Sequence, residues 1–298
     1  IASNYIRNKM RCPTHLSIGQ EAVAAASGLA LKQNDISISY HRSHAHFLAK
    51  GGSTKKLFAE LHGYEEGCSK GIGGSMHLVD LKNNFYGSTA IVSNSIPIGV
   101  GLAYSIKLAK KKNLVCIYIG DAAVEEGVFF ESINFSILKK LPVVFICENN
   151  DFSVYTRITE RQPNRPIYQL AEAQGISAYS GNGNDVEEVF SLAKTSLDRA
   201  REGNGPQFIE LSTYRWREHC GPDFDDDLNY RTRLEIEHGK KDCPIEKLAT
   251  RLKGINSKDQ FDLQRMEAEI QEEVASAFEF ALSSAKPSSK YEMDRVYA

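Results

Sequence analysis

Two polar side chains, Asp121 and Asn150, each follow an apolar run of the chain. Asp121 comes after residues 114–119 and one glycine, and Asn150 comes after residues 142–147 and two polar residues. A carboxylate and an amide oxygen suit Mg²⁺, which takes few protein oxygens and completes its coordination with phosphates and water. The two side chains are therefore candidate magnesium ligands.

Small residues surround Asp121, because Gly120 precedes it and Ala122 and Ala123 follow it. The two alanines open a predicted helix, and the free N–H groups and dipole at a helix start favour a phosphate. The structural alternative is that Asp121 only caps this helix. The matching place of Asn150, one strand further on, favours a magnesium diphosphate site.

The elements between these residues predict how they are positioned. An amphipathic stretch from about residue 125 to residue 139 separates the two apolar runs. The order strand, helix, strand predicts two parallel neighbours joined by a right-handed crossover. Both polar residues then lie at carboxyl ends of strands, at the edge where open α/β sheets bind ligands.

Two more predicted strands end at residues with functional side chains. Residues 36–40 lead into Arg42 and His44, and residues 206–213 lead towards His219. If all four strands belong to one parallel sheet, these side chains meet at one edge. We predict an α/β fold with a doubly wound, mostly parallel sheet and helices on both faces.

The rest of the chain predicts one principal domain, residues 1–298, with an N-terminal arm (1–14) and a helical C-terminal segment (about 244–298). Asp185 is a predicted helix N-cap, and residues 225–227 (DDD) a solvated loop. Further helices are predicted at residues 19–30, 53–63, 96–111, 167–175 and 185–202, and a glycine-rich loop at residues 67–75.

Composition excludes several classes of protein. The 298 residues are 42% hydrophobic and carry a net charge of −2, so a nucleic-acid or anionic-membrane surface is not indicated. No apolar run is long enough to span a bilayer, and no signal peptide is visible. The six cysteines lack C-x-x-C spacing, which favours free thiols and argues against a zinc site. We expect a cytoplasmic protein.

The motifs together resemble those of one family, the α subunits of the thiamine diphosphate-dependent 2-oxo acid dehydrogenases. These are decarboxylating components of the pyruvate, branched-chain 2-oxo acid and acetoin dehydrogenase complexes. The resemblance begins at HLSIGQEA (15–22) and runs to roughly residue 250. It takes in HRSH (41–44), GIGGSMH (71–77), GDAA (120–123), LPVVFICENN (141–150), YRWREH (214–219) and YRTR (230–233), in the family's order.

The resemblance implies cofactor roles for particular residues. Asp121 and Asn150 would be side-chain ligands of Mg²⁺, with the backbone carbonyl of Phe152 as a third ligand. Arg42 would hold the diphosphate, helped by backbone N–H groups of the segment Gly120, Ala122 and Ala123. The backbone between Ala90 and Val92 would hold the aminopyrimidine ring.

The resemblance also implies two catalytic histidines and a partner chain. His219 would contact the diphosphate from a mobile loop and reach towards the reacting carbon, and His44 would bind the 2-oxo acid or protonate intermediates. A separate β subunit would complete the active site in an α2β2 heterotetramer, and a lipoyl-bearing acyltransferase would receive the acyl group.

Three departures from the family's pattern bear on the substrate. Ala122 replaces the usual glycine, His41 stands where many relatives carry tyrosine, and Cys220 replaces the regulatory serine of the animal pyruvate enzymes. Imidazoles at 41, 44 and 46 would favour a polar acceptor. The alternative functions are a carboligase or transketolase-like transferase on the same scaffold and a non-catalytic assembly subunit.

Overall fold

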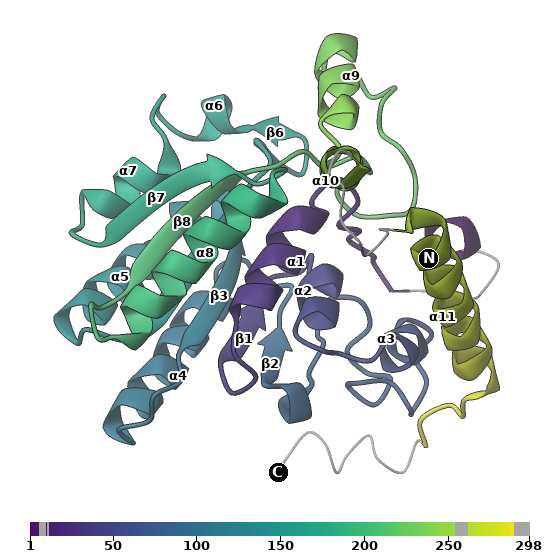
Figure 1. The fold of residues 1–298 in the computed structure, drawn as a ribbon, viewed down its shortest axis with the longest axis horizontal. Helices are drawn as coiled ribbons and strands as arrows, with labels where there is room; N and C mark the ends of the chain where they lie inside the picture. The colour runs from purple at the N-terminus through teal and green to yellow at the C-terminus, as the bar shows by residue number, and fades with distance from the viewer. Residues whose placement is uncertain (6–9, 11, 254–261, 289–298) are drawn as a thin grey trace.

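The computed structural model describes residues 1–5, 10, 12–253 and 262–288. At its centre is a six-stranded sheet in the order β2-β1-β3-β4-β8-β7, in which every neighbouring pair is parallel (Figure 1). The predicted parallel α/β fold is confirmed. The strands are β1 (Ile36–Ser39), β2 (Phe85–Ser88), β3 (Val115–Gly120), β4 (Val143–Asn149), β7 (Ser177–Asn182) and β8 (Gln207–Ser212).

Helices cover both faces of this sheet. One face packs against α4 (Ser95–Leu108), α5 (Gly127–Leu138) and α7 (Ile167–Glu172), and the other against α1 (Glu21–Ala30) and α8 (Val186–Arg201). A parallel sheet buried on both faces needs apolar side chains at successive positions, not only at alternate ones. This requirement explains the continuous apolar runs that predicted β3 and β4.

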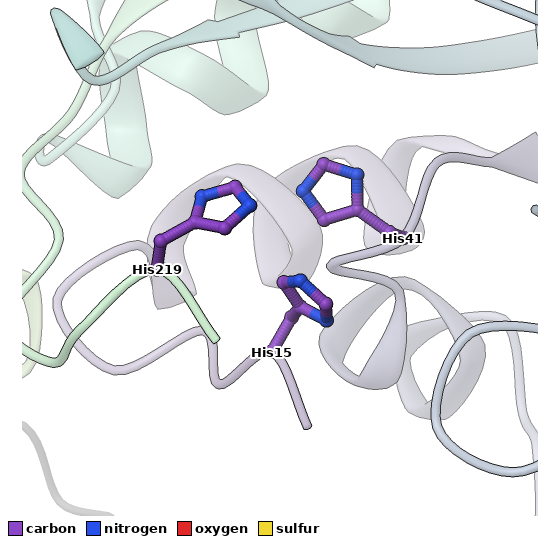
Figure 2. Close-up of side chains that lie close together, drawn as sticks. All are labelled: His15, His41 and His219. Carbon is purple, nitrogen blue, oxygen red and sulfur yellow. The ribbon is translucent and has the colours of Figure 1, made fainter. Parts of the chain in front are cut away.

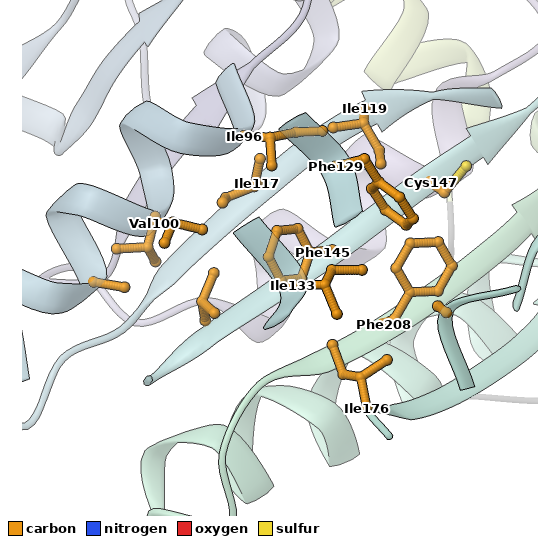
Figure 3. Packing of buried hydrophobic residues seen from close by; sticks show 14 of the residues in the cluster. Ile96, Val100, Ile117, Ile119, Phe129, Ile133, Phe145, Cys147, Ile176 and Phe208 are labelled. Atoms are coloured by element: carbon orange, nitrogen blue, oxygen red, sulfur yellow. The ribbon is translucent and has the colours of Figure 1, made fainter. Parts of the chain in front are cut away.

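Alternation along β3 shows how each face is filled. Ile117 and Ile119 join the cluster with α4 and α5, whereas Cys116 and Tyr118 join the cluster with α1 and α8. Figure 3 shows the first of these clusters, with Phe145 of β4 inside it. Burial of such a side chain contributes about 1.5–3 kcal/mol, so the two clusters fix the strands that carry the site.

The N-terminal third of the chain packs against the C-terminal helix. The helices α2 (His44–Ala49) and α3 (Thr54–Leu61) lie beside the sheet, and α11 (Leu263–Ser283) runs along α3 (Figure 1). The rings of Phe58 and Phe278 meet edge to face, with 4.5 Å between their centroids. The predicted helical C-terminal segment is thus confirmed in α10 (Pro244–Lys253) and α11, while residues 254–261 and 289–298 lie outside the described residues.

Several elements differ from the prediction. The strands β2 and β7 and the helix α9 (Arg233–Lys241) were not predicted. The predicted helix after Gly120 is divided into a 3₁₀ turn, η3 (Asp121–Glu125), and α5, which begins at Gly127. Smaller elements are η1 (Ala2–Asn4), η2 (Leu81–Asn83), β5 (Phe152–Ser153), β6 (Thr156–Arg157) and α6 (Ile158–Arg161).

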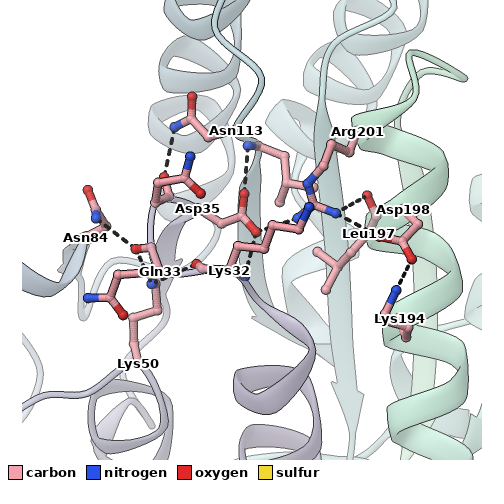
Figure 4. Close-up of polar contacts among 12 residues, drawn as sticks. Lys32, Gln33, Asp35, Lys50, Asn84, Asn113, Lys194, Leu197, Asp198 and Arg201 are labelled. Carbon is pink, nitrogen blue, oxygen red and sulfur yellow. Dashed lines mark hydrogen bonds and ion pairs between the residues drawn. The ribbon is translucent and has the colours of Figure 1, made fainter.

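A buried carboxylate ties the sheet together at the end of the strands opposite the predicted site. Asp35 has no exposed surface and accepts hydrogen bonds from Arg201 Nη2 (2.6 Å) and from the N–H of Leu114 (3.2 Å) (Figure 4). Arg201 belongs to α8, so this ion pair anchors α8 to the starts of β1 and β3. Removal of one partner of a buried pair typically costs 3–5 kcal/mol.

The path of the chain leaves a crevice between β1 and β3. From β1 the chain passes to β2 on one side, and it then returns to β3 on the other side of β1. Ligands of open α/β sheets bind at such reversals, outside the carboxyl ends of the strands. The topology therefore selects the loops after β1 and β3 as the place to look for a site.

No helix among the described residues is long and apolar enough to cross a membrane.

Candidate functional site

The loops after the neighbouring strands β1, β3 and β4, together with the segment after β8, line a cavity of about 190 Å³. Of the residues that the sequence predicted for the site, the structure brings together all except His44. The lining residues are His15, Tyr40, His41, Arg42, Met76, Ala90, Val92, Ser93, Gly120, Asp121, Ala122, Ala123, Asn150, Phe152, Ser153, Val154 and His219.

Asp121 lines the cavity and is only 3% exposed. Burial raises the pKa of its carboxyl group, and the neighbouring guanidinium of Arg161 opposes that rise. Arg161 pairs with both Asp121 and Glu125. Arg161 contacts Oδ2 of Asp121, so the second carboxylate oxygen can still bind a metal ion. Sequence reasoning missed Arg161, because nothing in its local pattern indicates that α6 turns back over β3.

Asn150 forms a tight turn at the end of β4. Its Oδ1 accepts a hydrogen bond from the N–H of Phe152 at 3.3 Å, and its Nδ2 donates to Gln20 Oε1 at 3.4 Å. The turn places Asn150 and Phe152 on the same cavity wall. Between them, Asp151 adopts a left-handed conformation with φ of 68°. An amide oxygen has two lone pairs, so Oδ1 can accept this N–H and still coordinate an ion.

Ala122 and Ala123 line the cavity from the 3₁₀ turn η3 rather than from the start of a long helix. The first N–H groups of a helical turn have no partner within it, so the predicted source of N–H donors is retained in a shorter element. The hydroxyl of Ser93 donates to the carbonyl of Ala123 at 2.8 Å. That bond ties η3 to the segment that precedes α4.

Arg42 is buried beside the cavity, with 2% of its surface exposed. Its Nη1 donates to the carbonyl of Leu16 at 2.6 Å and its Nη2 to the carbonyl of His219 at 3.1 Å, while the buried Nε has no hydrogen-bond partner. Burial lowers the pKa of this guanidinium to about 10. Arg42 therefore stays cationic at neutral pH and supplies a fixed positive charge.

Three imidazoles, those of His15, His41 and His219, gather on one wall of the cavity (Figure 2). Their ring centroids are 4.5 Å (15–41), 5.0 Å (15–219) and 5.2 Å (41–219) apart. Burial is the main cause that lowers their pKa values, to about 2 for His15 and about 3 for the other two, and the charge of Arg42 adds to it in each case. All three rings are neutral at pH 7.

His15 reaches this wall because two segments far apart in the sequence run side by side. The backbone N–H of Trp216 donates to the carbonyl of Ile18 at 3.1 Å, and the backbone N–H of Gly221 donates to the carbonyl of Thr14 at 2.8 Å. Gly19 permits the close approach, since its φ is 92° and a Cβ there would lie 2.3 Å from the Trp216 side chain. Sequence reasoning missed His15 as a site residue, although it begins the first family-like motif.

His44 lies outside the cavity lining, at the start of α2. It is 6% exposed, and its Nε2 lies 2.8 Å from Ser75 Oγ. Burial lowers the pKa of its ring to about 4. His46 also lies elsewhere, with its Nδ1 2.9 Å from Ser39 Oγ and its ring stacked on Tyr118. Of the imidazoles at 41, 44 and 46, the cavity therefore receives only His41.

The glycine-rich loop at residues 67–75 binds a carboxylate from within the chain. Glu60 of α3 is fully buried and accepts hydrogen bonds from four backbone N–H groups. The donors are Ser69 (2.7 Å), Gly71 (2.9 Å), Gly73 (2.7 Å) and Gly74 (3.1 Å). Because Glu60 uses these N–H groups, the loop is not a phosphate cradle; it leads instead to Met76 in the cavity wall.

The acidic run at residues 225–227 is not fully solvated, contrary to the prediction. Asp225 is 3% exposed and pairs with Arg231, and its carboxylate also lies 3.7 Å from Arg215 Nη2. Arg231 Nη1 donates in turn to the carbonyl of Arg215 at 2.6 Å. This buried ion cluster holds the segment that carries His219. Asp227 alone of the three is exposed.

Comparison with known proteins identifies the family of this chain. The profile of the family described as Dehydrogenase E1 component matches residues 1–290. The pyruvate dehydrogenase E1 component subunit alpha of Rickettsia bellii (strain RML369-C) is 37% identical over 283 residues, which cover 95% of this chain and 86% of the relative. The subunit of the same name from Rhizobium meliloti (strain 1021) is 37% identical over 276 residues, or 92% and 78% of the two chains.

A family match over residues 1–290, together with relatives that are 37% identical, establishes the family of this chain. The chain belongs to the dehydrogenase E1 component family, as an alpha subunit of a thiamine diphosphate-dependent 2-oxo acid dehydrogenase.

Proposed function

We propose that this chain binds thiamine diphosphate through Mg²⁺ and, with a separate β subunit, decarboxylates a small 2-oxo acid and passes the acyl group to a lipoyl-bearing protein. The observation that carries the proposal is the convergence of Asp121, Asn150 and Phe152 with Arg42 and His219 around one cavity. Hard oxygen donors and a fixed guanidinium are the chemistry that a magnesium diphosphate requires.

The residues present fit such a group. Asp121 is a buried carboxylate paired with Arg161, and Arg42 has a buried Nε without a hydrogen-bond partner. We assign Asp121, Asn150 and the Phe152 carbonyl to the metal. Arg42, with the backbone of Gly120, Ala122 and Ala123, is assigned to the diphosphate, and the backbone at Ala90 and Val92 to the aminopyrimidine. When bound, thiamine diphosphate supplies a thiazolium carbanion that adds to a keto carbon and permits the loss of carbon dioxide.

His219 and His44 take different parts in this proposal. His219 lines the cavity and is neutral at pH 7, so its ring can donate a hydrogen bond to a substrate oxygen or accept a proton without first losing one. His44 is a positioning residue, because it contacts Ser75 and so supports Met76 in the cavity wall. Because His44 is not among the residues that line the cavity, its direct contact with the 2-oxo acid stays a prediction.

The β partner is supported by an apolar rim around the cavity. Ile91 is 66% exposed, Val92 50% and Val154 44%, although residues of this type are usually buried. The cavity, at about 190 Å³, is also smaller than the roughly 300–1,000 Å³ of typical ligand pockets. Both features are expected where a second chain closes the site. We infer an α2β2 assembly.

A carboligase or transketolase-like transferase is the second candidate. One observation favours it, namely that three imidazoles give the cavity a polar wall suited to an aldehyde or sugar acceptor. Product analysis with and without a lipoyl domain separates the two functions. Acyl-lipoamide formation supports the dehydrogenase, and a ligated hydroxyketone as the main product supports the transferase.

The experiment that tests the assembly uses the purified chain alone and together with a candidate β chain, such as one encoded by a neighbouring coding sequence. Carbon dioxide release is measured from a panel of 2-oxo acids with thiamine diphosphate and Mg²⁺. We expect weak cofactor binding and no turnover by the chain alone, and turnover with the β chain. Robust decarboxylation by the chain alone would overturn the proposed dependence.

A further inference from the structure

His15, His41 and His219, called here the histidine cluster, have the geometry of a metal site that is separate from Asp121 and Asn150. The three residues come from the segments before α1, after β1 and after β8. One ring nitrogen from each lies within 4.8 Å of the others, and Figure 2 shows the rings converging. Among the described residues, no other group of three metal-ligating side chains meets this condition.

The rings of the histidine cluster lack protein partners. No described residue forms a hydrogen bond with any of the three rings, and the Nδ1 of His15 is buried without a partner although His15 is only 5% exposed. Most buried polar side chains have a hydrogen-bond partner, because leaving one unsatisfied costs free energy. The buried Nδ1 of His15 therefore lacks a partner that a bound ligand would supply, and it lies beside the half-buried rings of His41 and His219.

The chemistry of the donors selects the kind of ligand. Imidazole nitrogens bind Zn²⁺ and similar first-row ions, whereas Mg²⁺ prefers oxygen. A metal needs each imidazole neutral, which burial already favours at these positions. The neighbouring guanidinium of Arg42 directs its two Nη atoms to the carbonyls of Leu16 and His219 rather than to the rings.

We propose that the histidine cluster binds Zn²⁺, or a late first-row divalent ion of similar chemistry, through one nitrogen of each of its three rings. Three histidines with a fourth position open to water are a known arrangement for zinc. The cysteine spacing could not predict this site, since its ligands are imidazoles that lie far apart in the sequence. In the proposed dehydrogenase, a bound ion would occupy His219 and so inhibit turnover; this consequence rests on the proposed function, but metal binding does not.

The test is a titration of the full chain with Co²⁺ and then Zn²⁺, after removal of metals with a chelator and in excess Mg²⁺. We expect one equivalent of Co²⁺ to give the intense visible bands of four-coordinate cobalt, and Zn²⁺ to displace it. Loss of an outer hydrogen-bond partner of a metal ligand already costs about 10–100-fold in affinity. His15→Gln, His41→Gln and His219→Gln should therefore each weaken Zn²⁺ binding at least about tenfold, measured by calorimetry.

His77→Gln is the matched control, because His77 is exposed and outside the histidine cluster, and it should bind Zn²⁺ like the wild type. Equal affinity of the wild type and the three cluster variants would overturn the proposal. Zinc X-ray absorption on the wild type tests it without any variant. A shell of three imidazole nitrogens at about 2.0–2.1 Å supports the site, and a shell of oxygens alone, or no bound zinc, refutes it.

Discussion

The guanidinium of Arg42 donates to the carbonyl of His219 at 3.1 Å, across a sequence separation of 177 residues. Its other Nη atom donates to the carbonyl of Leu16 at 2.6 Å. One buried side chain therefore joins the loop after β1, the segment before α1 and the segment after β8. A substitution of Arg42 should therefore alter the position of His219, whether or not a cofactor is bound.

The first prediction concerns this junction. Arg42→Lys keeps the positive charge but replaces a planar fork of donors by one ammonium group, which cannot hold two carbonyls in the same geometry. We expect limited trypsin digestion to cleave the segment around Arg215 and Arg217 at least several-fold faster than in the wild type. Arg199→Lys, an exposed position on α8, should digest like the wild type. An unchanged cleavage pattern in Arg42→Lys would mean that the backbone bonds alone hold the segment.

The second prediction concerns the metal ligand. Asp121→Ala should abolish the Mg²⁺-dependent part of thiamine diphosphate binding, measured by calorimetry on the chain with its β partner, and leave the circular dichroism spectrum unchanged. The reason is that the buried carboxylate is the only anionic member of the assigned metal ligands. Asp227→Ala removes an exposed carboxylate and should bind the cofactor normally. Full affinity in Asp121→Ala would refute the assignment.

The central strands could be predicted from the sequence, and the two edge strands, β2 and β7, could not. Residues in β3 and β4 are buried on both faces, so they form continuous apolar runs. The edge strand β7 has the sequence SAYSGN and is partly exposed along its length. It forms because β8 offers a free edge for backbone hydrogen bonds, which its side chains do not reveal.

The same distinction applies to the candidate site. Asp121 and Asn150 directly follow predictable strands, so the sheet edge places them without further information. Arg161 and His15 reach the cavity through irregular segments, and no periodicity in the sequence indicates where those segments turn. The burial of Asp225 depends likewise on Arg231, which lies six residues away in a loop.

The third prediction concerns the glycine-rich loop. Glu60→Gln puts an NH₂ group where a carboxylate oxygen accepted two of the four backbone N–H groups, so two buried donors lose their acceptor. Each such loss costs about 1–3 kcal/mol, and we expect the free energy of unfolding to fall by roughly 2–6 kcal/mol in urea titrations. Glu66→Gln, at an exposed neighbouring position, should change it little. A near-neutral Glu60→Gln would show that the loop does not depend on this carboxylate.

The fourth prediction concerns acid stability and rests on His15. Burial lowers the pKa of His15 from 6.5 to about 2 in the folded chain. Below pH 6.5 the unfolded chain therefore binds a proton that the folded chain does not, so the free energy of unfolding must fall as the pH falls. For one group with this shift the loss between pH 7 and pH 5 is about 2 kcal/mol. His15→Gln removes the titrating group, so urea titrations in the presence of a chelator should show a loss smaller by about this amount over the same interval. Parallel stability curves for the wild type and His15→Gln would show instead that His15 binds its proton equally well in the folded and unfolded chains, and the lowered pKa of His15 would have to be abandoned.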